Sequence, residues 1–365
     1  MIKKDKKKKP IKVLVAVSGG VDSAVAVKIL SDQGYQVSGI FLNFWREGGE
    51  KENENKCCSL QAQMDAKNVC LALGVPFYTF DFSKKFKEAV VDNFLDEYSI
   101  GNTPNPCVVC NKKIKIGGLI KYAESLGFDY VATGHYARVE KDGKETKMFR
   151  GLDKKKDQSY FLYSLNQKEL SKLLLPLGSL KKPEVRKIAK RAGLLVASKS
   201  DSQEICFIPG KRHNDFLKKH LKLKSGDIKL LSSGEIIGQH QGLALYTIGQ
   251  RRGIEIGGNG PYYVAKFDYQ KNILNVVKNF NDPVLYCSEM KVKNINWLNQ
   301  DKLKFPIKIE VVIRYRHKAV KCSVSYDKKN NIAEVNFFRK QRAITPGQSA
   351  VFYLNDEVLG GGIIQ

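Results

Sequence analysis

Residues 11–23 read IKVLVAVSGGVDS, and this stretch decides the fold of the first half of the chain. Its first seven residues are apolar and rich in β-branched side chains, which predicts a short, buried strand of a parallel sheet. The helical pattern AVAVKILSDQ follows and is stopped by Gly34, a typical helix terminator. A strand that turns directly into a helix through two glycines predicts a loop that binds phosphate.

The same alternation continues further along the chain. Apolar strand patterns occupy residues 36–42, 77–81 and 130–132, and helical patterns occupy 59–73 and 83–99. Strands that alternate with helices predict an α/β fold with a doubly wound parallel sheet. A ligand of such a sheet is expected at the carboxyl ends of its strands.

The residue types in SGGVDS, 18–23, favour a polyphosphate ligand. Gly19 and Gly20 allow the backbone to turn tightly, and the serines add hydroxyl donors beside a helix N-terminus. Asp22 would repel a phosphate, so a carboxylate here makes sense if it helps to hold Mg²⁺ on the polyphosphate. The segment is not a Walker A loop, because no Gly-Lys-Ser/Thr follows it.

Composition indicates a globular protein with a polyanionic partner. The 365 residues carry 62 Lys and Arg against 37 Asp and Glu, a net charge of +25, and the basic residues are spread along the whole chain. Such an excess is typical of proteins that bind nucleic acid, since neutralised phosphates release counterions. We find no apolar run of about 18 residues and no signal peptide. A cytoplasmic protein without a membrane partner is therefore expected, with residues 1–10 as a basic, disordered tail.

Eight cysteines in a chain of this length do not predict a disulfide framework. Cys107 and Cys110 form a C-x-x-C in the segment 101–116, whose prolines and asparagines predict a loop that runs into a helix near Ile114. No second pair of ligands completes a zinc site. Cys206 has basic residues on both sides, which favours the thiolate, the nucleophilic form. Three further cysteines lie in apolar patterns and are predicted to belong to the core: Cys70, Cys287 and Cys322.

The second half of the chain changes to a β-rich pattern. Residues 213–280 contain many glycines and short strand patterns, and 281–365 contain alternating segments that predict an antiparallel barrel. Residues 328–331 (KKNN) predict a hairpin turn within it. Four regions are thus expected: a tail at 1–10, a catalytic domain at 11–212, a small central domain at 213–280 and a barrel at 281–365.

At this point the chain resembles a known family. It carries, in the family's order, SGGVDS, TPNPCVVCN, ATGHYAR, LDKKKDQSYFLY, DSQEICFI, GQHQGLALYTIGQRRG, RYR and TPGQSAVFYLNDEVLGGGII. These motifs resemble those of the tRNA-uridine 2-sulfurtransferases, members of the PP-loop ATP pyrophosphatase superfamily. The resemblance implies a PP-loop domain of the adenine nucleotide alpha hydrolase type, then a β-rich linker domain, then a β-barrel that binds tRNA.

The resemblance also implies roles for individual residues. Many relatives carry Met where this chain has Leu42, and many carry Asp where it has Cys107. ATP would be bound by Ala16, Val17, Ser18, Gly19, Gly20, Val21, Asp22, Ser23, Leu42 and Gly134. The target base and the rest of the tRNA would be contacted by Asn105, Pro106, Cys107, His135, Lys156, Asp157, Gln158, Arg314, Tyr315 and Gln348.

The chemistry implied is 2-thiolation of the wobble uridine of tRNAs for Lys, Glu and Gln, with AMP and pyrophosphate as products. ATP adenylates the C2 oxygen of the base. Cys206 carries a persulfide received from a sulfur-donor protein (a cysteine desulfurase or a sulfur relay protein), and its terminal sulfur attacks C2. Cys110 then attacks the persulfide, or assists release of sulfide, and a disulfide with Cys206 results. The fold must bring the two Cα atoms within roughly 7 Å at that step.

Several alternatives remain open from the sequence. Cys107 can line the base pocket, or it can join Cys110 and Cys206 as a ligand of an iron–sulfur cluster. His135 can contact tRNA or hydrogen-bond its own loop. Cys57 and Cys58 suggest no mechanism, and a structural role is expected for both. Two other classes of function share parts of the pattern: ATP-dependent ligases or amidases, which need no cysteine pair, and RNA-binding proteins for which ATP is only a regulatory ligand.

Overall fold

The computed structural model describes residues 10–47, 59–200, 205–208, 213–254, 256 and 260–365. Cys57, Cys58 and the basic residues 3–9 lie outside these ranges. The chain divides into two compact units. The first unit comprises residues up to 89 and 107–209, and the second comprises 90–106 and 210–365.

A five-stranded sheet in the order β3-β2-β1-β4-β7 forms the centre of the first unit, and every neighbouring pair is parallel. β2 and β3 follow β1 on one side of it, and β4 and β7 are added on the other side. The direction in which strands are added therefore reverses between β1 and β4. This reversal is the position where doubly wound sheets bind ligands. The predicted fold and the four predicted strands are confirmed: β1 is Lys12–Ala16, β2 Gln36–Asn43, β3 Phe77–Asp81 and β4 Tyr130–Ala132. A fifth strand that the sequence analysis does not predict, β7, is Leu173–Leu174.

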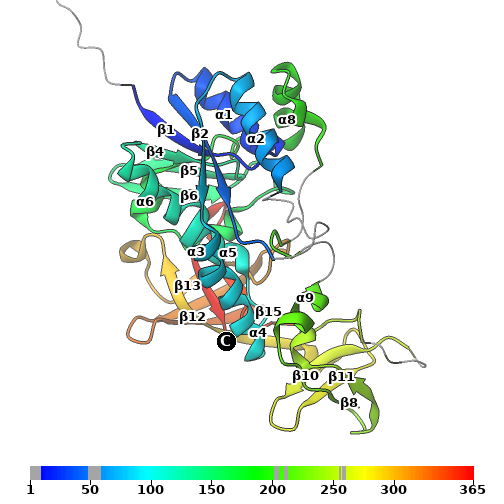
Figure 1. The fold of residues 1–365 in the computed structure, drawn as a ribbon. Coiled ribbons are helices and arrows are strands. Elements are labelled where there is room, and N and C mark those ends of the chain that lie inside the picture. Colours follow the sequence, from blue (N-terminus) through cyan, green and yellow to red (C-terminus); the bar gives the residue numbers. More distant parts are fainter. Residues whose placement is uncertain (1–9, 48–58, 201–204, 209–212, 255, 257–259) are drawn as a thin grey trace, which may run out of the picture. The chain divides into compact units, whose positions relative to one another are not determined.

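Helices cover both faces of this sheet (Figure 1). On one face lie α1 (Val21–Asp32), α2 (Leu60–Ala72) and α8 (Lys182–Arg191), and on the other lies α6 (Gly117–Ser125). The apolar side chains of β1, β2, α1 and α2 form one buried cluster, and those of α1 and α8 form another. The first helix is therefore packed on two sides, which holds its N-terminus at the sheet edge.

Smaller elements complete the first unit. A hairpin of β5 and β6 is antiparallel, and a capping box in which Asn166 and Glu169 bond each other's backbone N–H starts α7. The bounds are β5 Ala137–Asp142, β6 Glu145–Arg150, η3 Ser159–Phe161, α7 Gln167–Ser171 and η4 Leu195–Ser198.

The segment around the C-x-x-C motif is helical, so the prediction of a loop that extends to Ile114 is wrong. The helix begins at Pro106: α5 is Pro106–Cys110, η2, a π-helical segment, is Asn111–Lys115, and α6 follows. Proline suits the first position of a helix, because its φ is already helical and that position needs no N–H donor. The predicted helix at 83–99 is confirmed as three consecutive segments, α3 (Ser83–Phe86), η1 (Lys87–Asp92) and α4 (Asn93–Ser99).

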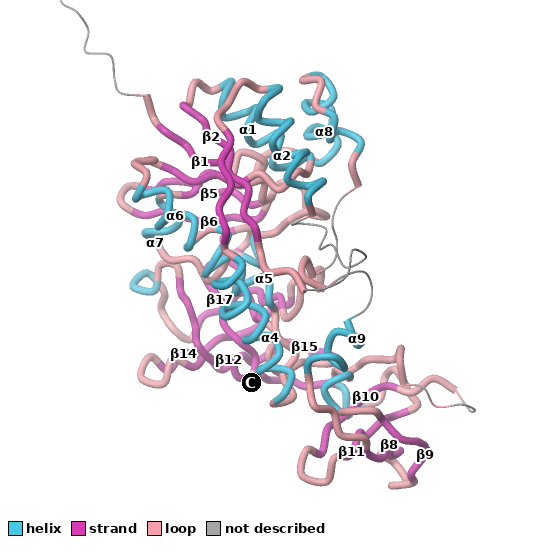
Figure 2. The backbone as a smooth tube through the Cα atoms, viewed as in Figure 1, coloured by secondary structure: helices cyan, strands magenta, loops and turns pink. Residues whose placement is uncertain are grey.

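The second unit contains two β-structures, shown by their strands in Figure 2. A small sheet has the order β10-β11-β8-β9 and follows α9 (His213–His220). Only its β8–β11 pair is parallel. Its strands are β8 Gly226–Leu230, β9 Ile236–His240, β10 Tyr263–Asp268 and β11 Ile273–Val277.

Six antiparallel strands form the barrel, in the order β12-β15-β14-β13-β16-β17, and pairing of β12 with β17 closes it. Inside it, Trp297 stacks on Phe352 with 5.1 Å between ring centroids. The predicted barrel and its hairpin turn are confirmed, and Asn331 has φ +53° in that turn. The strands are β12 Tyr286–Trp297, β13 Ile307–Val312, β14 Val320–Asp327, β15 Ile332–Arg342, β16 Ser349–Leu354 and β17 Glu357–Ile364.

Among the described residues, no helix combines the length and the apolar character that a membrane crossing requires.

Candidate functional site

The glycine loop after β1 is shaped to expose backbone amides. Gly19 has φ +72°, and a Cβ there would lie 2.2 Å from the carbonyl oxygen of Ala62. Gly20 is the N-cap residue of α1 and places no side-chain cap on the helix. Ser23 Oγ accepts the Ser18 amide at 3.1 Å and donates to the Gly20 carbonyl at 3.1 Å. The first amides of a helix without a side-chain cap are suited to bind an anion.

The loop after β4 closes on this helix start. A Cβ on Gly134 would lie 2.8 Å from the backbone of both Asp22 and Ser23, so only glycine allows the approach. Leu42 lies in β2 with 6% of its surface exposed. The N–H of Val17, just after β1, donates to the carbonyl of Ile40 in β2. The structure therefore brings the glycine loop and Gly134 together at the reversal between β1 and β4, whereas Leu42 lies on β2, on the other side of β1.

Asp22 is engaged by a buried lysine. Both of its carboxylate oxygens accept from Lys182 Nζ at 2.7 Å, and one also accepts from the hydroxyl of Tyr136 at 2.7 Å. The Lys182 side chain is 9% exposed and that of Asp22 is 32% exposed. A magnesium ion at Asp22 would have to displace this lysine. The residues of the loop as they stand thus fit a polyphosphate better than they fit the metal.

The sequence analysis does not identify Lys182 as a residue of the nucleotide site, although its position at the start of a helix is unusual for a lysine. Lysine is unusual in the first turn of a helix, where the dipole favours acidic side chains. The capping pattern at 181–184 (KKPE) places Lys182 at that position.

A second lysine ties the glycine loop to the segment before Cys206. Lys199 Nζ donates to the Gly19 carbonyl at 3.0 Å and to the carboxylate of Asp65 at 2.7 Å. Burial acts to raise the pKa of Asp65, but the hydrogen bonds from Lys199 and Gln61 outweigh it and lower the pKa. Arg186 holds the same segment from α8 by donating to the carbonyls of residues 197 and 199.

The two cysteines predicted to be catalytic both belong to the first unit. Cys110 is 4% exposed at the end of α5, and therefore does not lie in the polar loop expected for it. Cys206 is half-buried. Its neighbour Phe207 is 1% exposed and packs edge-on against Phe86, with 5.8 Å between ring centroids, and Phe86 stacks on Phe44 at 4.8 Å. This aromatic series anchors Cys206 in the first unit.

None of the described cysteines forms a disulfide, so the Cys110–Cys206 disulfide expected from the resemblance is not present in this state. In the part of the chain that the structure describes, no three His, Cys, Asp or Glu side chains are grouped to hold a metal. The arrangement of Cys107, Cys110 and Cys206 therefore does not fit the ligand set of an iron–sulfur cluster.

The cysteines assigned to the core behave differently from one another. Burial raises the pKa of Cys70 to about 11, and burial together with Glu310 raises that of Cys322 to about 12. Both thiols are therefore protonated and inert, as predicted. Cys287 is exposed, so its assignment to the core is wrong. It lies in β12 at a position that faces away from the barrel interior.

Within the second unit, the segment before Asn105 is held in place by Gln348. The side-chain amide of Gln348 donates to the carbonyl of Thr103 at 2.8 Å, and Thr103 N–H donates to Pro346. A Cβ on Gly347 would lie 2.8 Å from Asn102, so the two segments are in close contact. A residue predicted to contact tRNA thus supports the segment predicted to contact the target base.

Two side chains of the 156–158 segment accept hydrogen bonds from backbone amides of the first unit. Asp157 accepts the amide of Gly151 at 2.9 Å and that of Ser159 at 3.1 Å. The side-chain oxygen of Gln158 accepts the amide of Tyr136 at 3.0 Å. These contacts fix the loop that carries Lys156.

His135 hydrogen-bonds its own loop and also lies beside the glycine site. Its Nδ1 is 2.8 Å from Thr133 Oγ1. Burial, with Lys115 nearby, lowers the pKa of His135 to about 3, so the ring is neutral at physiological pH.

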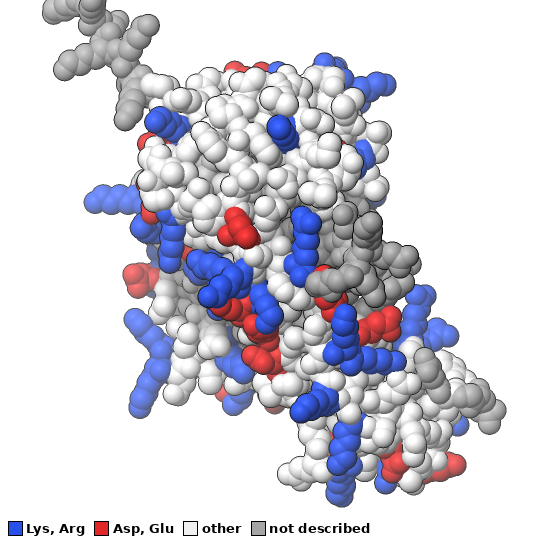
Figure 3. Space-filling model, viewed as in Figure 1, with Lys and Arg blue, Asp and Glu red and all other residues white. Residues whose placement is uncertain are grey.

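In the second unit, Arg314 and Tyr315 lie in the turn that follows β13 (Ile307–Val312). Arg316, with φ +62°, stacks its guanidinium over the Tyr315 ring at 5.4 Å. Figure 3 shows lysine and arginine side chains distributed over the visible face without a single dominant patch.

Comparison with known proteins places these features in a family. Residues 11–210 match the model of a tRNA methyl transferase HUP domain, 214–278 that of a tRNA methyl transferase PRC-barrel domain, and 287–364 that of an aminomethyltransferase beta-barrel domain. Among solved structures, NMN synthetase from Francisella tularensis matches with a TM-score of 0.34 and 18% identity, over 56% of this chain and 71% of that one.

Curated relatives match over almost their full length. The tRNA-specific 2-thiouridylase MnmA of Buchnera aphidicola is 44% identical over 98% of both chains. The protein of the same name from Bacillus subtilis is 44% identical over 99% of this chain and 96% of its own. With the PP-loop, the two cysteines and the three domains in their order, this chain belongs to the tRNA-specific 2-thiouridylase family.

Proposed function

We propose that this protein is an ATP-dependent sulfurtransferase that converts the wobble uridine, position 34, of tRNAs for Lys, Glu and Gln to 2-thiouridine, with release of AMP and pyrophosphate. The strongest support is that a phosphate-binding glycine loop and the two candidate catalytic cysteines, Cys110 and Cys206, belong to one compact unit. The relatives are named for 2-thiouridylation, whereas the family model is named for methyl transfer. Two cysteines in the same compact unit as a phosphate-binding loop favour sulfur chemistry.

In the first step, the loop amides bind the polyphosphate of ATP, and the ammonium groups of Lys182 and Lys199 supply positive charge beside them. The C2 oxygen of uridine attacks the α-phosphorus, the bond to the β-phosphate oxygen breaks, and pyrophosphate leaves. The C2 oxygen now carries AMP, a far better leaving group than oxide.

In the second step, the terminal sulfur of a Cys206 persulfide attacks C2. The Cys110 thiolate then attacks Sγ of Cys206, the bond between that Sγ and the transferred sulfur breaks, and its electron pair stays on the transferred sulfur. Collapse at C2 expels AMP and leaves 2-thiouridine. The enzyme is left with a Cys110–Cys206 disulfide, which a dithiol reductant must reduce before a sulfur-donor protein reloads Cys206. This order requires motion, since the two cysteines form no disulfide in the structure.

The remaining assignments follow from the same proposal. Residues 11–212 are the catalytic domain, 213–280 the linker domain and 281–365 the tRNA-binding barrel. The sulfur donor is a cysteine desulfurase or a sulfur relay protein, and the reducing cytoplasm keeps the thiols active. Asn105, Pro106 and Cys107 contact the target base, while Lys156, Arg314 and Tyr315 contact the tRNA.

An anaerobic assay tests the proposal. Purified protein receives ATP, Mg²⁺, a small-molecule persulfide donor and unmodified tRNA, and 2-thiouridine, AMP and protein-bound iron are all quantified. We expect wild type to be active without iron, Cys110→Ser and Cys206→Ser to be inactive with a persulfide donor, and Cys107→Ser to stay active. Cys287→Ser is the control, because Cys287 is exposed and lies in the second unit. Full activity of both Cys110→Ser and Cys206→Ser would instead indicate a ligase, and an absence of AMP would indicate an RNA-binding protein only.

A further inference from the structure

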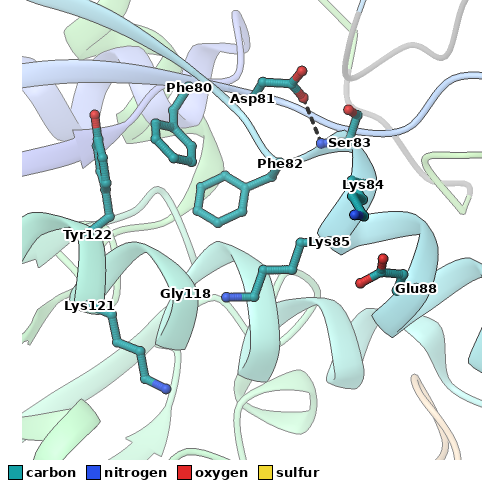
Figure 4. Close-up of a pocket in the computed structure, with 10 residues that line it drawn as sticks. All are labelled: Phe80, Asp81, Phe82, Ser83, Lys84, Lys85, Glu88, Gly118, Lys121 and Tyr122. Carbon is teal, nitrogen blue, oxygen red and sulfur yellow. Dashed lines mark hydrogen bonds between the residues drawn. The ribbon is translucent and has the colours of Figure 1, made fainter.

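A pocket whose lining includes no residue of the glycine loop lies in the first unit (Figure 4). It is open to solvent, has a volume of about 660 Å³, and is formed by the end of β3, the start of α3 and η1, and α6. Volumes of this order are typical of pockets that hold small molecules or single nucleotides. None of the sequence motifs above assigns a role to it.

Aromatic rings form the inner wall of the pocket. Phe80 lies 4.1 Å from Tyr122 and 4.7 Å from Phe82 between ring centroids. Phe82 is buried, whereas Phe80 and Tyr122 keep part of their surfaces exposed. Figure 4 shows these three rings together between the strand and the helix. Partly exposed aromatic faces are platforms on which nucleic-acid bases stack.

Three lysines surround this wall: Lys84, Lys85 and Lys121. All three are exposed, and within the described ranges no carboxylate pairs with them. Asp81 and Glu88 also line the pocket. Asp81 accepts the Ser83 amide at 2.7 Å, and hydrogen bonds from Ser83 lower the pKa of Asp81, so this carboxylate serves to start α3. Ammonium groups beside aromatic faces match the phosphate and the base of a nucleotide.

The position of the pocket suits a nucleotide close to the reacting base. β3 ends at the same edge of the parallel sheet as β1, which leads into the glycine loop. Gly118, in the pocket wall, follows Cys110 by eight residues of nearly continuous helix, a separation of about 12 Å at the rise of an α-helix. That distance is close to the span of two nucleotides in an extended strand.

We propose that this pocket binds a single-stranded nucleotide of the tRNA that lies within two nucleotides of the target uridine in the anticodon loop. Its base stacks on Phe80 and Tyr122, and its phosphate is bound by Lys84, Lys85 and Lys121. The inference rests on the proposed function, since it takes tRNA as the substrate. An acidic peptide of a protein partner would use the lysines but would gain little from the aromatic wall.

The test compares tRNA binding and turnover of three proteins. The first is the triple variant Lys84→Ala, Lys85→Ala, Lys121→Ala, and the second is Tyr122→Leu. The third, a matched control, removes three exposed lysines of the same unit that lie away from the pocket: Lys67→Ala, Lys144→Ala and Lys190→Ala. Kd is measured for an anticodon stem-loop over a series of salt concentrations, and KM and kcat for tRNA are measured with ATP and a small-molecule persulfide donor.

We expect the pocket triple variant to weaken binding at least 10-fold and to reduce the slope of log Kd against log salt by about 1 to 2 more than the control does. Tyr122→Leu should weaken binding about 10-fold with an unchanged salt slope. Both should raise KM and preserve kcat at saturating tRNA. Equal effects of pocket and control variants would overturn the proposal.

A third result would assign the pocket to a protein partner and also overturn it: unchanged tRNA binding, with turnover lost only when sulfur comes from a donor protein. Wild type that produces no 2-thiouridine would refute the proposed function itself. Failure of the proposed function can be told apart from failure of the pocket proposal, because binding of the stem-loop is measured without turnover.

Discussion

The ion pair of Lys182 and Asp22 offers the sharpest quantitative test of the nucleotide site. Lys182→Met keeps the length and packing of the side chain but removes its ammonium. Asp22 then retains only the Tyr136 hydroxyl of its three short contacts. Removing one member of a buried ion pair costs about 3–5 kcal/mol, because the remaining charge is stranded. Since 32% of the Asp22 side chain is exposed, water compensates part of this loss, and we expect about 2 kcal/mol.

Native-state hydrogen exchange, read by mass spectrometry, is the appropriate assay, because a chain of two units does not unfold in one step. A loss of about 2 kcal/mol should accelerate amide exchange in α1 and α8 about 30-fold. Lys187→Met is the control, since Lys187 is exposed on the same helix. It should change exchange less than about 2-fold.

The double variant Lys182→Met, Asp22→Asn isolates the pair. Once the stranded carboxylate is neutralised, most of the lost protection should return, with a coupling free energy of about 1–2 kcal/mol. Additive effects of the two substitutions, within about 0.3 kcal/mol, would refute the reasoning, because they would show that the contact contributes nothing to the stability of the site.

Three further outcomes follow from single contacts. Gly19→Ala should abolish ATP binding by calorimetry, because its Cβ would lie 2.2 Å from a backbone oxygen, whereas Gly74→Ala, also at positive φ but in open space, should bind ATP normally. Lys199→Met should change the Kd for ATP by less than about 10-fold. In this variant a non-hydrolysable ATP analogue should no longer change the rate at which Cys206 is alkylated, because Lys199 links the segment before Cys206 to Gly19. An alkylation rate that still depends on the analogue would contradict this link. Because the pKa of His135 is lowered to about 3 in the fold and lies near 6.5 when unfolded, its contribution to stability is complete above pH 6.5 and is lost as the pH falls toward 3. Wild type should therefore lose about 2 kcal/mol more than His135→Gln between pH 7 and 5 in urea unfolding of the first unit, and equal losses would disprove the assignment.

The elements that sequence predicted well are those whose side chains carry a strong local pattern. The apolar run at 11–17, the strand at 36–42 and the alternating barrel segments appear where expected, because burial on one or both faces dictates their composition. The loop assigned at 101–116 failed for a local reason as well. Proline and asparagine indicate turns on average, but Pro106 occupies the one helical position that favours proline.

Residues that function through distant contacts could not be found in the same way. Lys182 meets Asp22 across 160 positions of sequence, and Lys199 meets Gly19 across 180. Gln348 was assigned to tRNA, but its amide supports a backbone carbonyl 245 positions earlier. No periodicity or spacing carries such information.

The sequence by itself determined the doubly wound sheet, the phosphate-binding turn and the presence of two candidate sulfur carriers, because each depends on residues adjacent in the chain. Only the tertiary structure decided which cations reach the glycine loop, that Cys110 is buried in a helix, and that aromatic rings and lysines from β3, α3 and α6 share one pocket. The physical reason is that these properties depend on burial and on distances across the sheet. Both are set by packing between segments that are remote in the sequence.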